Sequence, residues 1–96
     1  MDCSEKTTVR SDEDKRSLIN RLSRIEGQIR GVKAMIEADK YCKDILVQSS
    51  AISHALDSFN REILDAHVKG CVVRDVRNGK DEVVDELIEL VHRLMR

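Results

Sequence analysis

The sequence predicts an all-α fold, and three observations support this. Apolar residues recur at spacings of three and four along most of the chain, which is the periodicity of a helix with one covered face. The 96 residues include no proline. No segment shows the strict alternation of apolar and polar residues that marks a half-buried strand. A chain of this length is expected to form one domain, and we place it at 14–96, after a mobile polar tail at 1–13.

The first helix is predicted from about residue 14 to the end of an apolar seam, with Ser11 or Asp12 capping its start. The seam consists of Leu18, Leu22, Ile25, Ile29, Val32 and Ile36. Gly27 and Gly31 lie away from it, although each costs up to about 1 kcal/mol relative to alanine inside a helix. Packing on the seam does not explain them, so their position indicates that another molecule approaches the backbone there.

Two more helices follow a short connector at 38–41. The second runs from Cys42 to about Lys69, with an extension past Gly70 to Val76, and Asn78-Gly79 predicts the turn that stops it. The third runs from 81 to about 95. A helix of about 28 residues is roughly 40 Å long, and so short a chain cannot cover its apolar face. We therefore expect several copies to assemble into a helical bundle.

The composition excludes some functions and leaves others open. Aromatic residues make up only 2% of the chain, which argues against a protein that stacks the bases of single strands. No apolar run approaches the roughly 20 residues of a membrane span and no signal peptide is evident, so we expect a cytoplasmic protein with reduced cysteines. Residues 15–33 carry six bases and one acid. This asymmetry is a weak indication of a polyanion-binding face, and a solvated helix surface explains it about equally well.

Three side chains form a candidate metal site. His67 and Cys71 are four residues apart and share a helix face, but Cys42 lies 25 residues before His67, or roughly 37 Å along a helix. One chain therefore cannot bring all three together, whereas two chains with antiparallel second helices can. Two thiolates and one imidazole suit three-coordinate Cu(I), and Zn(II) normally takes a fourth ligand. The alternative is two structural cysteines and a surface histidine.

Three motifs carry a resemblance to a known family. They are Arg21-Leu22-Ser23-Arg24-Ile25-Glu26-Gly27-Gln28-Ile29-Arg30-Gly31, then Tyr41-Cys42, and then His67-Val68-Lys69-Gly70-Cys71. From about Asp14 to Met95 the chain resembles the CsoR/RcnR family of bacterial metal-sensing repressors. The resemblance implies antiparallel four-helix-bundle dimers that pair into a tetramer, and binding to double-stranded operator DNA without a helix-turn-helix. In the copper branch, the metal-free protein holds DNA and releases it when Cu(I) binds between protomers, which derepresses copper export and homeostasis genes.

The resemblance also assigns roles to particular residues. It implies one Cu(I) per protomer, bound at the interface between two chains by Cys42, His67 and Cys71. Tyr41 and Glu86 are the implied supports of these ligands, with Asp85 as the alternative acid. Arg21 and Arg24 are the implied DNA contacts, and the plausible helpers are Arg16, Gln28, Arg30 and Lys33.

Other readings remain open at the level of the sequence. One is a repressor of the same fold that responds to persulfide or to nickel, cobalt or zinc, although the nickel and cobalt branch uses an N-terminal ligand where this chain has Arg10. Another is a copper carrier that does not bind DNA. No nucleophile–base motif or phosphate-binding glycine loop is recognisable, so we expect no enzyme. Cys3 is interpreted as an uninvolved thiol, and His54 and His92 as surface or interface residues.

Overall fold

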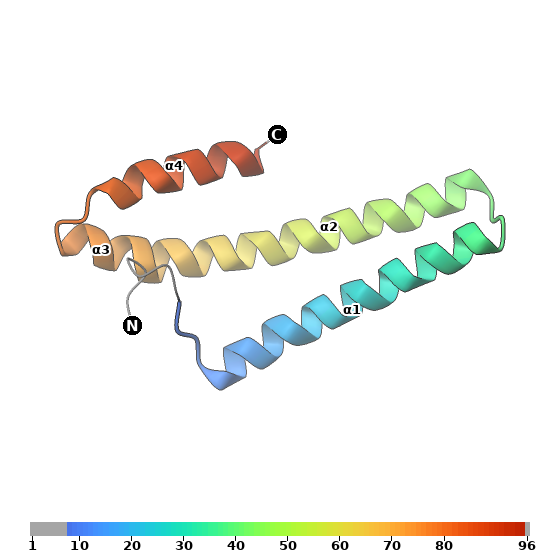
Figure 1. Ribbon diagram of the computed structural model, residues 1–96, viewed down its shortest axis with the longest axis horizontal. Coiled ribbons are helices and arrows are strands. Elements are labelled where there is room, and N and C mark those ends of the chain that lie inside the picture. Colours follow the sequence, from blue (N-terminus) through green and yellow to red (C-terminus); the bar gives the residue numbers. More distant parts are fainter. Residues whose placement is uncertain (1–7, 96) are drawn as a thin grey trace. The chain divides into compact units, whose positions relative to one another are not determined.

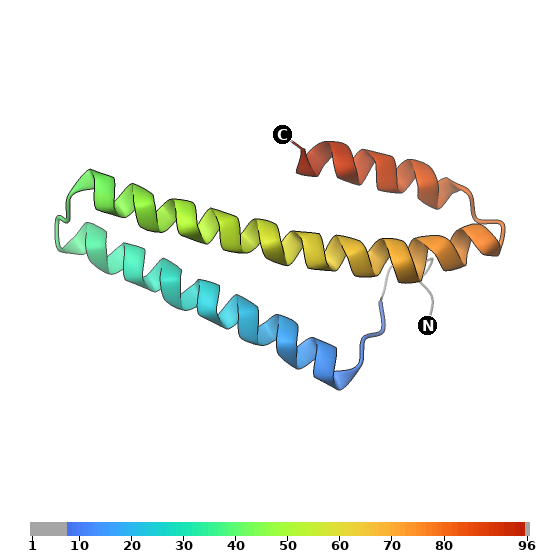
Figure 2. The same cartoon turned by 180° about the vertical axis from the view of Figure 1, so that it is seen from behind.

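A computed structural model describes residues 8–95, and Figures 1 and 2 show its helices from two sides. Within these residues there is no strand, so the all-α prediction is confirmed. Cys3 lies outside the described residues. None of the described helices is long and apolar enough to span a bilayer. The elements in chain order are α1 (Asp12–Glu37), α2 (Cys42–Ala66), the π-helix η2 (His67–Val72), α3 (Val73–Arg77) and α4 (Glu82–Leu94).

Helix α1 begins at a side-chain cap. Ser11 has an extended backbone, and its hydroxyl oxygen accepts a hydrogen bond from the Asp14 backbone N–H at 3.1 Å. Three acids in the first turn stabilise the helix, because their negative charges lie at the positive end of the helix dipole. Of the two residues predicted to cap this helix, Ser11 and Asp12, the structure shows Ser11 as the cap. Helix α1 begins at Asp12, slightly before the predicted start of the domain at about residue 14.

The connector after α1 turns through a left-handed residue. Lys40 N–H donates to the Met35 carbonyl at 3.0 Å, and Asp39 between them has φ 53°. That conformation costs roughly 1–2 kcal/mol for a residue with a Cβ. The turn after α3 also requires a left-handed residue. Gly79 takes this position with φ 82° and without the steric cost, because glycine adopts such angles freely. The predicted turn at Asn78-Gly79 is confirmed.

The second predicted helix is an uninterrupted helical segment from Cys42 to Arg77, formed by α2, η2 and α3. Its residues keep right-handed helical backbone angles on both sides of η2, at Ala66 and Val73. A π-helix closes i→i+5 hydrogen bonds and therefore has a wider turn than an α-helix; such turns occur frequently at functional sites. The sequence did not predict this change of helix type.

The chain divides into two compact units, and the boundary falls inside α2, between Glu62 and Ile63. In the unit of residues 10–62, α1 and α2 run antiparallel on either side of the connector (Figure 1), and Ile25 is buried. Much of its other apolar surface is exposed, as at Ile36 and Leu46, which are 59% and 68% exposed. The α1 seam therefore forms no closed core within this unit.

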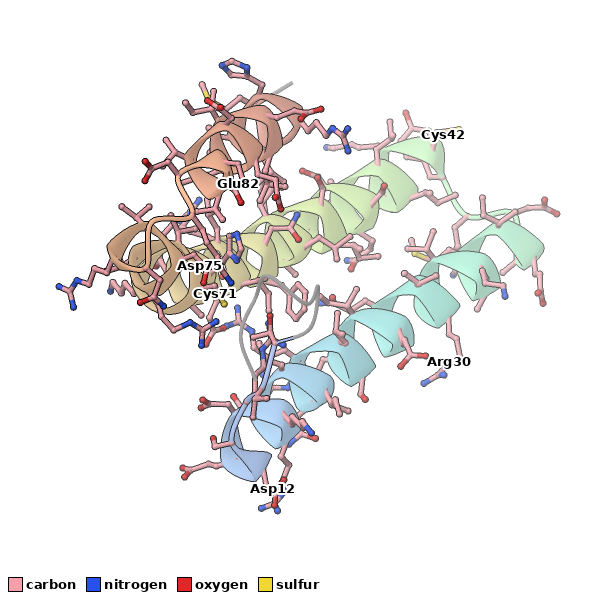
Figure 3. The ribbon with its side chains drawn as sticks, turned by 60° about the vertical axis from the view of Figure 1, so that its left-hand side comes forward. Asp12, Arg30, Cys42, Cys71, Asp75 and Glu82 are labelled. Atoms are coloured by element: carbon pink, nitrogen blue, oxygen red, sulfur yellow. The ribbon has the colours of Figure 1, made fainter. Side chains whose placement is uncertain are left out.

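The second unit contains η2, α3 and α4, which contact one another. Its buried residues are Cys71, Val72 and Asp75, and Figure 3 labels Cys71 and Asp75 on the η2–α3 segment. The Asp75 carboxylate lies 3.6 Å from Nε of Arg74, which supplies the opposite charge that a buried carboxylate requires. This acid was not among the sequence-predicted core residues.

Candidate metal site and DNA-binding surface

The π-helix η2 carries two of the three predicted metal ligands, His67 as its first residue and Cys71 as its fifth. Cys71 is 7% exposed, and its sulfur lies 4.0 Å from the hydroxyl oxygen of Thr8. Only the thiolate form of a cysteine binds a metal. His67 is half-buried, and Gly70 lies between the two ligands.

A pocket of about 290 Å³ connects His67 to α4. It is lined by His67, Glu86, Glu89, Leu90 and Arg93. Two of these residues form an ion pair, in which Nη2 of Arg93 donates to Oε1 of Glu89 at 3.2 Å. Glu86 shares the pocket with His67 and Asp85 does not, which favours Glu86 as the acid that supports the imidazole. Glu89 also lines the pocket, and no sequence motif indicated it.

The third predicted ligand, Cys42, is the first residue of α2 (Figure 3) and has an exposed free thiol. Tyr41 precedes it and is also exposed. Within residues 8–95 of one chain, no three histidine, cysteine or acidic side chains come together as a metal site. The chemistry of the donors, sulfur and imidazole nitrogen, suits a soft ion such as Cu(I). That two chains share the site remains a prediction.

The candidate DNA contacts lie on α1, and all but one are exposed. The exposed residues are Arg16, Arg24, Gln28, Arg30 and Lys33; Arg30, for example, points away from the helix in Figure 3. Arg21 differs because its side chain is only 33% exposed. Its Nη1 donates to the Glu62 carboxylate in a salt bridge, and its Nη2 donates to the Ser58 hydroxyl at 2.9 Å. The sequence did not predict these partners.

The two glycines of α1 lie on the same face as two of the candidate DNA contacts. Arg24, Gly27, Gln28 and Gly31 follow the i, i+3, i+4, i+7 spacing of one helix face. A Cβ added to Gly31 would meet no atom within 4 Å, and one added to Gly27 would meet only Nη2 of Arg30 at 3.8 Å. Nothing within the described chain therefore requires glycine at either position.

The described chain is all-α, carries a sulfur–imidazole pair, Cys71 and His67, on η2, and has a basic helix, α1. A comparison with known protein families is consistent with these features. Residues 14–93 match the family described as metal-sensitive transcriptional repressor. The chain belongs to this family. The family that the sequence motifs indicated is thereby confirmed, and its members have a regulatory rather than an enzymatic role.

Similar members of the family are named as copper sensors. The copper-sensing transcriptional repressor CsoR of Bacillus subtilis (strain 168) is 38% identical over 88 residues, which are 91% of this chain and 87% of that protein. The copper-sensing transcriptional repressor RicR of Mycobacterium tuberculosis is 42% identical over 87 residues, 88% of this chain and 91% of that protein.

Two solved structures of similar transcriptional regulators have related folds. The copper-sensing repressor CsoR with Cu(I) from Geobacillus thermodenitrificans matches with a TM-score of 0.89 at 38% identity, over 94% of this chain and 95% of that one. The nickel-responsive transcriptional regulator InrS matches with a TM-score of 0.74 at 42% identity, over 92% of this chain and 100% of that one.

Proposed function

We propose that this repressor responds to copper(I): it binds operator DNA when metal-free and releases the DNA when Cu(I) binds. Release derepresses genes for copper export and homeostasis. The observation that carries the proposal is the pair of soft donors, His67 and Cys71, on the single turn of η2, in a chain 38% and 42% identical to two named copper sensors. A repressor of this kind works where the DNA is, in the cytoplasm.

The proposed site contains one Cu(I) per protomer and takes Cys42 from a second chain. Cys42 from one protomer and His67 and Cys71 from its neighbour would hold the Cu(I), which would link the two chains when bound. Glu86 orients the imidazole by accepting a hydrogen bond from its unligated ring nitrogen, as acids beside metal-binding histidines commonly do. Because Glu86 belongs to α4 and lines the His67 pocket, an imidazole fixed by metal also restrains α4. Tyr41 is placed to support Cys42 from the connector.

The shared site requires an oligomer, and the uncovered apolar surface supports one. A pocket of about 520 Å³ on α2 is lined by Lys43, Leu46, Val47 and Ser50. Leu46 and Val47 are both more than half exposed, and antiparallel packing of a second α2 would cover them. We infer a dimer of four-helix-bundle type, and pairing of two dimers into a homotetramer through the further apolar surface that α4 exposes at Ile88 and Leu94.

The basic helix α1 is the proposed DNA contact. Arg21 and Arg24 are the principal contacts, assisted by Arg16, Gln28, Arg30 and Lys33. Contacts of lysine and arginine to phosphate release counterions, so the affinity falls steeply as salt rises. Since α1 presents no dense edge of base-reading side chains, recognition relies on phosphate positions and duplex shape.

The decisive experiment is an anaerobic Cu(I) titration of the reduced protein bound to a duplex from upstream of its own gene. We expect release at one Cu(I) per protomer. By linkage, the DNA must weaken copper binding by the same factor by which copper weakens DNA binding. His67→Ala keeps the two thiolates, so it should retain part of the copper affinity but lose the coupling to DNA. If this variant still releases DNA normally, the proposed role of His67 is wrong.

A second candidate signal is nickel, and the similarity to the nickel-responsive regulator InrS favours it over other metals. A parallel Ni(II) titration distinguishes the two. Release by stoichiometric Ni(II) without release by Cu(I) would replace copper by nickel in the proposal. Persulfide is tested in the same format by treatment with a low-molecular-weight persulfide, whose oxidised sulfur accepts the two electrons of the two thiols and leaves as sulfide, with mass spectrometry for a Cys42–Cys71 link between chains. A protein that binds copper but no DNA at any salt concentration would be a carrier.

A further inference from the structure

Arg21 is the one candidate DNA contact in the described chain whose guanidinium is already bound to an acid. Its two terminal nitrogens are both engaged by α2, one by the carboxylate of Glu62 and the other by the hydroxyl of Ser58. The planar guanidinium presents its donors in a fixed fork that matches carboxylate and phosphate alike. The Glu62 carboxylate therefore occupies donors that a DNA phosphate would use.

We propose that Glu62 competes with DNA phosphate for Arg21 and thereby lowers the DNA affinity of the repressor. The inference rests on the proposed role of Arg21 in DNA binding. Two like charges do not share one guanidinium without cost, because a carboxylate that stays beside Arg21 also repels the incoming phosphate. Glu62 is thus an affinity-setting residue, which is a different role from that of Ser58. Ser58 is neutral, so it positions the guanidinium without repelling DNA.

The exposure of the pair indicates that the competition is reversible. The side chains of Arg21 and Glu62 are 33% and 49% exposed, so water and salt reach both. Exposed ion pairs of this kind change an equilibrium constant by a factor of roughly 1.4 to 5. A phosphate that approaches with the whole basic helix can displace a contact of this strength. Glu62 therefore lowers the affinity without abolishing binding.

The test is Glu62→Gln in the full-length, reduced, metal-free protein, measured with a duplex from upstream of its own gene. Glutamine keeps the shape of the side chain and can still accept a hydrogen bond, but it carries no charge. We expect DNA binding to tighten by roughly 1.4- to 5-fold for each protomer that contacts the duplex. Asp57→Asn is the matched control, since Asp57 is an exposed acid of α2 and the substitution changes the net charge equally.

The dependence of the DNA affinity on salt concentration distinguishes this role from a merely structural one, which would leave the salt slope unchanged. In the unaltered protein, salt weakens the Arg21–Glu62 pair as well as the phosphate contacts, and the first effect partly offsets the second. Glu62→Gln lacks this offset, so its affinity should fall more steeply with salt than that of the unaltered protein or of Asp57→Asn. Ser58→Ala removes a neutral partner only and should leave the slope unchanged.

Several outcomes overturn the inference. If Glu62→Gln binds DNA more weakly, the acid holds Arg21 in its binding position rather than competing for it. If it tightens binding no more than Asp57→Asn, the effect is one of net charge alone. Circular dichroism with unchanged helix content verifies the fold of each variant. Arg21→Ala separates this inference from the proposed function: if its DNA affinity is unchanged, Arg21 is no DNA contact, whatever Glu62 does.

Discussion

Gly31→Ala provides a test in which stability and DNA binding should change in opposite directions. Gly31 lies in the interior of α1, where alanine is favoured over glycine by about 1 kcal/mol. The added methyl group meets no atom of the chain within 4 Å, so no steric term opposes this gain. For a chain of about this size, 1 kcal/mol raises the unfolding temperature by about 4–8 °C.

The DNA affinity of the same variant should fall. Gly31 shares a face with Arg24 and Gln28, and a methyl group there would hold a phosphate backbone away from the helix. The assay is thermal unfolding by circular dichroism at one fixed protomer concentration, because oligomers unfold in a concentration-dependent way, together with DNA titration at one salt concentration. Asn60→Ala, at an exposed position of α2, is the control for improved helix propensity alone.

Two results would refute this reasoning separately. A lower unfolding temperature would mean that another copy of the chain packs against Gly31, so that the methyl group clashes in the assembly. A higher unfolding temperature with DNA affinity equal to that of Asn60→Ala would mean that no phosphate approaches this face. Gly27→Ala should behave in the same way, since its methyl group would make only an ordinary contact with Arg30.

Three further substitutions have defined outcomes. Asp39→Gly should raise the free energy of unfolding by about 1 kcal/mol, because it relieves a left-handed φ of 53°; no gain in a denaturant titration would contradict this. Ser11→Ala should cost about 1 kcal/mol through loss of the α1 cap, whereas Ser17→Ala inside the helix should not destabilise the protein. Arg24→Ala should weaken DNA binding and lower the salt slope by about 1 for each phosphate that the arginine neutralises, and Arg77→Ala, at an exposed position outside α1, should leave that slope as it is.

The local features of the fold could be predicted because local chemistry determines them. A serine before an acidic turn caps a helix, and Asn78-Gly79 offers the left-handed residue that a turn needs. The π-helix η2 could not be predicted in this way, since His67 and Cys71 have the same i, i+4 spacing as in an ordinary α-helix. Only Gly70 between them is unusual, and a glycine does not by itself specify a π-turn.

The partners of the predicted residues were harder to foresee than the residues themselves. The basic character of α1 is visible in the sequence, but the pairing of Arg21 with Glu62 joins positions 41 residues apart. It depends on the register between the antiparallel helices α1 and α2 (Figure 1). The burial of Asp75 likewise depends on how α4 packs against η2 and α3. Distant side-chain pairs and the burial of single residues depend on the tertiary arrangement, which the apolar periodicity does not specify.

The boundary between the two compact units falls inside a helix, between Glu62 and Ile63, and not in a loop. Units joined by a loop can be exchanged between proteins during evolution, or separated by limited proteolysis. Here any such cut would break the hydrogen-bonded backbone of α2 and leave its new ends without partners. A cut at this boundary would therefore separate the basic helix from the sulfur–imidazole pair only at the cost of helix backbone hydrogen bonds in α2.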